Sequence, residues 1–214
     1  MAGRRFVGIN MKKSVIIFLM LALTVGIFGC AAQPSDTQPP QDPNDLQPRR
    51  TEQTTEAQEN IFTAEAEDDY VRYIGGGIRI LLESGFVPTT AEEGYIIYTN
   101  GFLTVVLSRT DDYDAQMLAQ SGFDMEKLTE EEYGSILVDA NNLPTDSLFY
   151  DWMDNVCLTQ SGKDSGGSDY ESYSVIKKDT ATNTFWLIQF IGNPKVYEPY
   201  SVYFPEWAAS AVFY

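Results

Sequence analysis

An uncharged apolar run near the N-terminus limits what this chain can fold into. The run covers residues 14–29 and follows a pair of lysines. A positive start, an apolar stretch and a small residue at its end form the pattern of a secretory signal. The run is shorter than the ~20 residues that a membrane-spanning helix needs. We therefore expect residues 1–29 to be a signal peptide, with Met11 as the true start.

The end of this run, Ile27-Phe28-Gly29-Cys30, resembles the lipobox of bacterial lipoproteins. Ile27, Gly29 and Cys30 match the motif, and Phe28 is larger than the residue usual there. The resemblance implies lipidation at Cys30, for example with palmitate, and anchoring on the extracytoplasmic face of the cell membrane. Two or more acyl chains explain stable anchoring, because one chain binds only marginally. The alternative is an uncleaved membrane anchor, which places the rest of the chain on the same side.

The segment after the cysteine is unsuited to folding. Residues 31–60 contain five of the ten prolines, and Leu46 is their only large apolar residue. Such a stretch buries too little surface to offset its chain entropy. We expect residues 30–63 to be the lipidated cysteine and a disordered, proline-rich tether. A single globular domain over residues 64–214 is then expected outside the membrane.

Charge and residue usage exclude several functions. The chain has a net charge of −17, and from Cys30 onward ten basic residues stand against 31 acidic ones, a net −21. This charge repels nucleic acid and anionic lipid headgroups, so we expect no nucleic-acid partner. The chain contains no histidine, which excludes Ser-His catalysis and leaves zinc and haem without their usual ligand. We expect no cofactor and no metal.

Hairpins and short strands dominate the predicted domain. Asn100-Gly101 lies between two β-rich runs, 95–99 and 102–107, and this pair takes the two positive φ angles of a type I′ turn cheaply. A second hairpin joins residues 170–177 to residues 184–191, and the second of these runs is apolar enough to lie centrally in a sheet. Further strands are expected at residues 78–82 and 147–160, with a loop over residues 161–168.

Helices are expected between and after these strands. One covers residues 112–121 and ends before Gly122. Another covers residues 129–142, where Thr129 and Glu132 form a capping box. A third begins at Pro205 and continues to Phe213. The order of elements implies an α+β fold, in which a largely antiparallel sheet is flanked by helices.

Two segments resemble the PsbP-like family. The run Phe185-Trp186-Leu187-Ile188-Gln189-Phe190 is similar to the family's aromatic-rich penultimate strand, and residues 204–212 are similar to its last helix. The resemblance implies an α/β/α sandwich over about residues 70–214. It also implies a binding or assembly role, because the family's known members are accessory proteins. No binding motif of the family has a match here.

The candidate sites are few. Tyrosines and a tryptophan near the C-terminus form either an exposed contact patch or part of the core: Tyr197, Tyr200, Tyr203 and Trp207. Carboxylates at Asp111, Asp112 and Asp114 either bind a cation or stabilise a helix N-terminus. Asp164-Ser165-Gly166-Gly167 resembles a serine-protease loop but lacks a histidine, and Cys157 is expected to be a small buried hydrophobe.

Three functions remain open from the sequence. The first is a non-catalytic binding or assembly domain that is held by a lipid anchor and meets a protein or an envelope polymer. The second is an extracytoplasmic hydrolase that uses paired carboxylates. The third is the substrate-capturing component of a transporter, for which one domain of ~150 residues is small. We expect the first, and therefore no enzyme.

Overall fold

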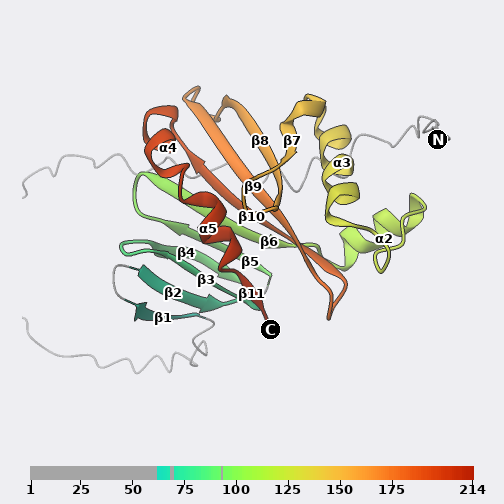
Figure 1. Cartoon of the computed structure of the whole chain (residues 1–214), viewed down its shortest axis with the longest axis horizontal. Coiled ribbons are helices and arrows are strands. Elements are labelled where there is room, and N and C mark those ends of the chain that lie inside the picture. Colours follow the sequence, from blue (N-terminus) through green and yellow to red (C-terminus); the bar gives the residue numbers. More distant parts are fainter. Residues whose placement is uncertain (1–61, 68–69, 93) are drawn as a thin grey trace, which may run out of the picture.

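The computed structural model describes residues 62–67, 70–92 and 94–214, which form two antiparallel sheets and four α-helices (Figure 1). The four-stranded sheet has the order β1 (Phe62–Glu67), β2 (Tyr70–Gly75), β3 (Ile78–Glu83), β11 (Val212–Phe213). The seven-stranded sheet has the order β4 (Val87–Glu92), β5 (Tyr95–Thr99), β6 (Leu103–Arg109), β10 (Thr184–Gly192), β9 (Asp169–Asp179), β8 (Val156–Lys163), β7 (Leu148–Tyr150). The helices are α2 (Asp112–Gln120), α3 (Glu130–Asn141), α4 (Pro194–Tyr200) and α5 (Phe204–Ala209), with a short 3-10 helix η1 (Thr145–Ser147) before β7.

Strand β10 forms the centre of the large sheet. It pairs with β6 on one side and β9 on the other, and both of its faces are apolar. Trp186, Ile188 and Phe190 contribute to the core on one face, and Phe185 and Leu187 contribute to the core on the other. A strand that is covered on both faces reads as a continuous hydrophobic run, as predicted.

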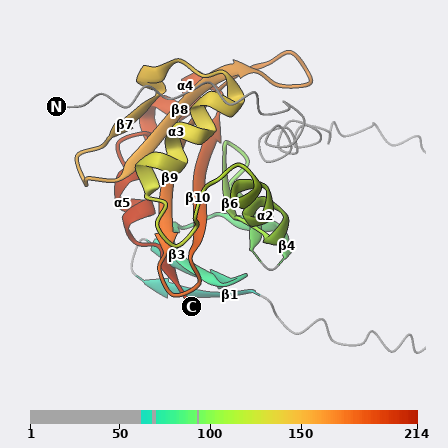
Figure 2. The same ribbon diagram turned by 90° about the vertical axis from the view of Figure 1, so that its right-hand side faces the viewer.

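The two faces of the large sheet are covered by different layers. On one face lie the small sheet and helices α4 and α5, with Phe204 of α5 stacked on Phe190 at a ring distance of 4.5 Å. On the other face lies α3, whose Tyr133 stacks on Phe185 at 4.4 Å. Figure 2 shows α2 and α3 on the side of the sheet opposite to α5. The domain is therefore a sheet packed on a sheet, with helices added to both sides.

The expected fold class is wrong. We predicted one antiparallel sheet between helical layers, the α/β/α sandwich of the PsbP-like family. Instead, strands outweigh helices in the described residues, and a second sheet occupies much of one face. The reason lies in residues 62–83, where Gly76 and Gly77 adopt positive φ angles of 58° and 90° and turn β2 back onto β3. Gly75 ends β2, and Gly76 and Gly77 form the hairpin turn that leads into the predicted strand β3.

Most local predictions are confirmed. The hairpins β5–β6 and β9–β10, the helices α2 and α3 and the strand β3 all form. Thr129 and Glu132 make the predicted capping box. The type I′ turn is wrong, because Gly101 has a positive φ but Asn100 does not; the Asn100 side chain instead accepts the N–H groups of Phe102 and Leu103.

Two other local predictions are wrong. The strand expected over residues 147–160 is interrupted by a turn between β7 and β8, and β8 extends into the expected loop as far as Lys163. The last helix ends at Ala209, after which Val212 and Phe213 pair with β3. The signal run, Cys30 and the tether as far as residue 61 lie outside the described residues, whereas Phe62 and Thr63, which we assigned to the end of the tether, belong to β1.

Candidate functional site

The turn that interrupts the predicted strand is built around one carboxylate. Oδ1 of Asp151 accepts the backbone N–H groups of Met153 (2.8 Å) and Asn155 (3.0 Å). Oδ2 accepts the Tyr173 hydroxyl (2.6 Å) and the Asn155 side-chain amide (2.8 Å). Asp154 takes a positive φ of 58°, which an aspartate tolerates better than most residues. Three of these hydrogen bonds hold the turn over residues 151–155, and the fourth ties it to Tyr173.

The same carboxylate connects the turn to the core. Tyr173 is buried, and its hydroxyl oxygen lies 3.0 Å from the Cys157 sulfur. Lys177 of the same strand, β9, donates to the side-chain oxygen of Asn155 at 2.6 Å. Asn155, Cys157 and Tyr173 are all buried. Because each buried polar group in this network has a partner, the network stabilises one conformation of the turn.

The pKa shifts in this network oppose nucleophilic chemistry. Burial raises the pKa of the Cys157 thiol to about 12, so the sulfur is neutral near pH 7. Burial, followed by donation to Asp151, raises the pKa of Tyr173. Burial acts to raise the pKa of Asp151, but the bonds from Tyr173 and Asn155 outweigh it and leave the pKa below its ordinary value. Asp151 is therefore an ionised acceptor that organises the turn.

The outer side of the turn is apolar and exposed. Trp152 is 64 % exposed, Tyr150 is 55 % exposed and Met153 is 41 % exposed. Figure 2 shows the segment between β7 and β8 projecting beyond the edge of the large sheet. We refer to Tyr150, Trp152 and Met153 as the aromatic tip. The structure thus presents three large side chains to solvent, one at the end of β7 and two on the turn that Asp151 holds by hydrogen bonds.

The C-terminal aromatic residues predicted from the sequence lie elsewhere and mostly serve packing. Trp207 is only 3 % exposed, and Tyr203 stacks on it at a ring distance of 5.8 Å. Tyr197 packs edge-on against Phe204, and burial raises its pKa to about 12. Tyr200 also contacts Trp207, at 6.1 Å. Of the four, Tyr203 alone exposes much of its ring, so the structure does not assemble them into one surface.

The acidic residues at the start of α2 act on the helix itself. Asp111 is the N-cap, and its side chain accepts the N–H of Asp114 while Asp114 accepts the N–H of Asp111. Asp112 lies in the first turn, where negative charge favours the helix dipole. Within the described parts of the chain, no three His, Cys, Asp or Glu side chains lie together in a way that could hold a metal ion.

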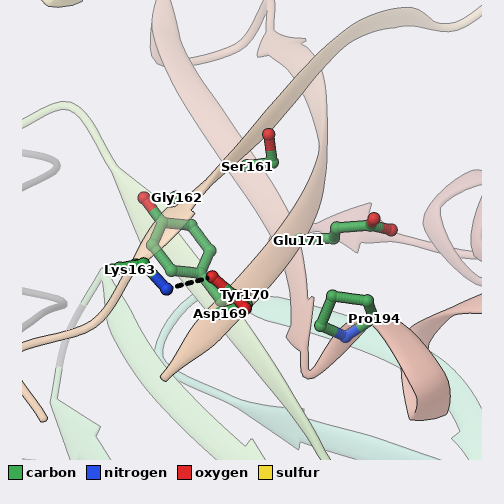
Figure 3. A pocket seen from close by; sticks show the side chains of 7 residues that line it. All are labelled: Ser161, Gly162, Lys163, Asp169, Tyr170, Glu171 and Pro194. Carbon is green, nitrogen blue, oxygen red and sulfur yellow. Dashed lines mark hydrogen bonds and ion pairs between the residues drawn. The ribbon is translucent and has the colours of Figure 1, made fainter. Parts of the chain in front are cut away.

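A hollow of about 400 Å³ lies where the β8–β9 hairpin meets the start of α4 (Figure 3). Lys163 and Asp169 form an exposed ion pair there at 2.6 Å. Figure 3 shows the Glu171 side chain pointing away from that pair. A pair of catalytic carboxylates faces the same substrate bond. The carboxylates of Asp169 and Glu171 do not face each other in this hollow. Asp164, of the protease-like loop, accepts the N–H groups of Gly166 and Ser168 and so forms a turn.

No model of a protein family matches the chain, and no curated protein resembles it significantly. Over the residues that the structure describes, none of the helices is both long and apolar enough to cross a membrane. The function must therefore be argued from this chain's own residues.

Sequence reasoning missed the aromatic tip because it assigned residues 147–160 to one strand. A signal was present, since Asp151 and Asn155 flank Trp152 and Met153, two adjacent bulky residues that break the alternation of a strand. Asp and Asn also favour turns, because their side chains bond to backbone N–H groups nearby. The predicted burial of Cys157 is confirmed, and its partner Tyr173 is a contact that only the fold creates.

Proposed function

We propose that this chain is an extracytoplasmic lipoprotein, anchored in the cell membrane through Cys30, whose domain binds a protein or envelope polymer through the aromatic tip. The observation that carries the proposal is Trp152, which is 64 % exposed on a turn that Asp151 holds by four hydrogen bonds. The role is binding or assembly rather than catalysis.

Exposure and rigidity together support this role. Tryptophan and tyrosine dominate the energetics of protein interfaces, because each buries a large area on contact. A surface that is already ordered loses less conformational entropy when a partner binds. The network of Asp151, Asn155 and Tyr173 orders this turn before any partner arrives. The tip thus combines the residue types and the preorganisation that a binding site needs.

The acidic composition is compatible with a domain that faces away from the bilayer. A net charge of −17 is repelled by anionic headgroups, so lipid attachment at Cys30 would leave the domain free above the surface. The many prolines of residues 31–60 favour an extended tether. Together they would bring the aromatic tip to partners outside the membrane.

Two measurements test the proposal. Metabolic labelling with palmitate should mark the chain, and Cys30→Ser should abolish the label. Binding partners cross-linked from intact membranes should be lost with Trp152→Ala and retained with Phe102→Ala, which removes an equally exposed aromatic ring at the β5–β6 turn. If Trp152→Ala retains its partners, the binding role of the aromatic tip is wrong. If the chain carries no label, the lipid anchor at Cys30 is wrong.

A further inference from the structure

Two exposed carboxylates, those of Asp154 and Glu131, lie at the aromatic tip. Asp154 is exposed within the turn itself, next to Met153. On α3, Glu131 accepts the Tyr150 hydroxyl at 3.0 Å and is also exposed. The hydrogen bond to Glu131 is the main cause that raises the pKa of Tyr150, and the charges of Glu131 and Glu130 add to it. Apolar contact area and negative charge thus occur at the same place.

The nearby lysines leave this negative charge in place. Lys177 donates to the amide oxygen of Asn155 at 2.6 Å. Lys178 donates to the carbonyl oxygens of Glu126 and Leu128, both at 2.8 Å, and lies over the Phe185 ring. Both cations are directed to neutral oxygens rather than to the carboxylates of Glu131 and Asp154. A cation supplied by a partner would therefore find these two carboxylates accessible.

The charges also disfavour insertion of the tip into a membrane. Loops and helices that insert at a membrane surface pair their aromatic residues with Lys or Arg, which attract anionic lipid. Here Trp152 and Met153 are flanked by Asp151 and Asp154 instead. The partner surface should then be both able to contact aromatic rings and positively charged.

Building on the binding role proposed above, we infer that the aromatic tip receives a basic polypeptide segment, whose arginine or lysine side chains pack on Trp152 and Tyr150 and pair with Glu131 and Asp154. A guanidinium group stacks on aromatic faces and bonds carboxylates in the same plane, which suits this combination. The net charge of −17 additionally steers a cationic partner toward the domain and speeds association. A basic segment is thus complementary in charge both to the two carboxylates at the tip and to the acidic chain as a whole.

Trp152 provides the readout. Of the three tryptophans in the chain, Trp186 and Trp207 are 1 % and 3 % exposed, so a ligand added in solution affects mainly the emission of Trp152. The full chain in a non-ionic detergent is titrated with hexa-arginine, hexaglutamate and the neutral sugar chitotriose. Hexa-arginine is expected to change the emission, and its affinity should fall about tenfold as salt rises from low to high concentration, because screening weakens exposed charge pairs.

Paired variants separate local from global charge. Glu131→Gln with Asp154→Asn removes two charges at the tip; glutamine still accepts the Tyr150 hydroxyl, and asparagine tolerates the positive φ of residue 154. Glu198→Gln with Glu206→Gln removes two exposed charges on α4 and α5. The tip pair should weaken hexa-arginine binding about fivefold, and the control pair less than about twofold.

Several results would overturn the inference. Equal losses in the two double variants would mean that only the net charge attracts the peptide. Binding of chitotriose or hexaglutamate in place of hexa-arginine would identify a different class of ligand. If Trp152→Ala abolishes partner capture from membranes but hexa-arginine never perturbs Trp152, the binding role stands and the basic partner is wrong.

Discussion

Removal of the Asp151 carboxylate tests most directly whether the turn is held as described. Asp151→Ala deletes the acceptor of the four N–H and O–H hydrogen bonds from Met153, Asn155 and Tyr173, and of a longer one from the Cys157 thiol. Hydrogen bonds to a charged group each contribute about 1.5–3 kcal/mol when shielded, and less where water replaces the acceptor. Since Asp151 is only partly buried, we expect a total loss of about 3 kcal/mol in the free energy of unfolding.

The matched control is Asp164→Ala. Asp164 forms a similar turn at the β8–β9 hairpin, where its carboxylate accepts the N–H groups of Gly166 and Ser168 next to solvent. Its loss should cost about 1 kcal/mol, because water can satisfy both exposed donors. Urea denaturation followed by circular dichroism measures both variants. In a thermal melt, the Asp151 variant should lose roughly 6–12 °C for a domain of ~150 residues.

A double-mutant cycle completes this test. Tyr173→Phe removes one of the four donors and leaves the ring contacts of Tyr173 with Phe149 and Phe204 in place. If Asp151 and Tyr173 stabilise each other, the combined loss of the double variant should be smaller than the sum of the single losses by about 1 kcal/mol. Strict additivity, or a loss for Asp151→Ala no larger than that for Asp164→Ala, would refute the reasoning.

Acid should weaken the same network. The folded pKa of Asp151 lies below its ordinary value, because bonds from Tyr173 and Asn155 outweigh the effect of burial. The stability that this carboxylate contributes is therefore fully present above its unfolded pKa of ~3.9 and is lost as the pH falls through the folded pKa. The difference in unfolding free energy between the natural protein and Asp151→Ala should narrow below about pH 4. A difference that widens in acid would contradict the assignment.

Further predictions concern the thiol and the helix cap. Cys157 is fully buried and its pKa is raised to about 12. In a Cys30→Ser chain at pH 8, it should therefore not react with a thiol reagent until denaturant is added. Rapid reaction of the native protein would contradict its burial. Thr129→Ala should lower the unfolding free energy by about 1 kcal/mol, because the N–H of Glu132 loses its acceptor, and Thr129→Ser should restore it.

The elements that the sequence predicts well are those whose signals are local. Helix α3 begins where Thr129 and Glu132 exchange hydrogen bonds across four residues, and α2 ends where Gly122 adopts a φ of 89°. The hairpin β9–β10 has long β-rich runs on both sides of a short polar turn. In each case the residues that decide the structure lie within a few positions of one another.

Apart from β3, the small sheet could not be predicted in this way. Strand β1 pairs with β2 over six positions, yet its sequence has no apolar run that indicates a strand. Strand β11 has two residues and exists because Val212 and Phe213 pair with Arg79 and Ile78, far away in the sequence. Just before it, the Ser210 hydroxyl accepts the N–H of Leu81 on the free edge of β3. Such contacts depend on the assembled core, which local patterns do not specify.

The candidate site shows the same division between local and distant signals. Asp151 and Asn155 indicate a turn locally. The exposure of Trp152 depends in addition on the position of the turn, which is fixed by hydrogen bonds from Tyr173 and Lys177. By contrast, Tyr197 and Tyr200, for which the sequence leaves both a surface patch and a packing role open, pack against Phe204 and Trp207. Aromatic residues in a sequence thus do not reveal which of them will face solvent.

Two variants separate the rigidity of the turn from the contact that Trp152 makes with a partner. Comparing them is the strictest test of the binding role. Trp152→Ala should reduce binding and leave stability nearly unchanged, because the ring has few contacts within the domain. Asp151→Ala should reduce both binding and stability, although its carboxylate is directed inward to Tyr173 and Asn155 and does not contact the partner. Binding falls because the partner must then order a loosened turn. If Asp151→Ala loses stability but keeps full affinity, preorganisation has no part in recognition, and the network serves the fold alone.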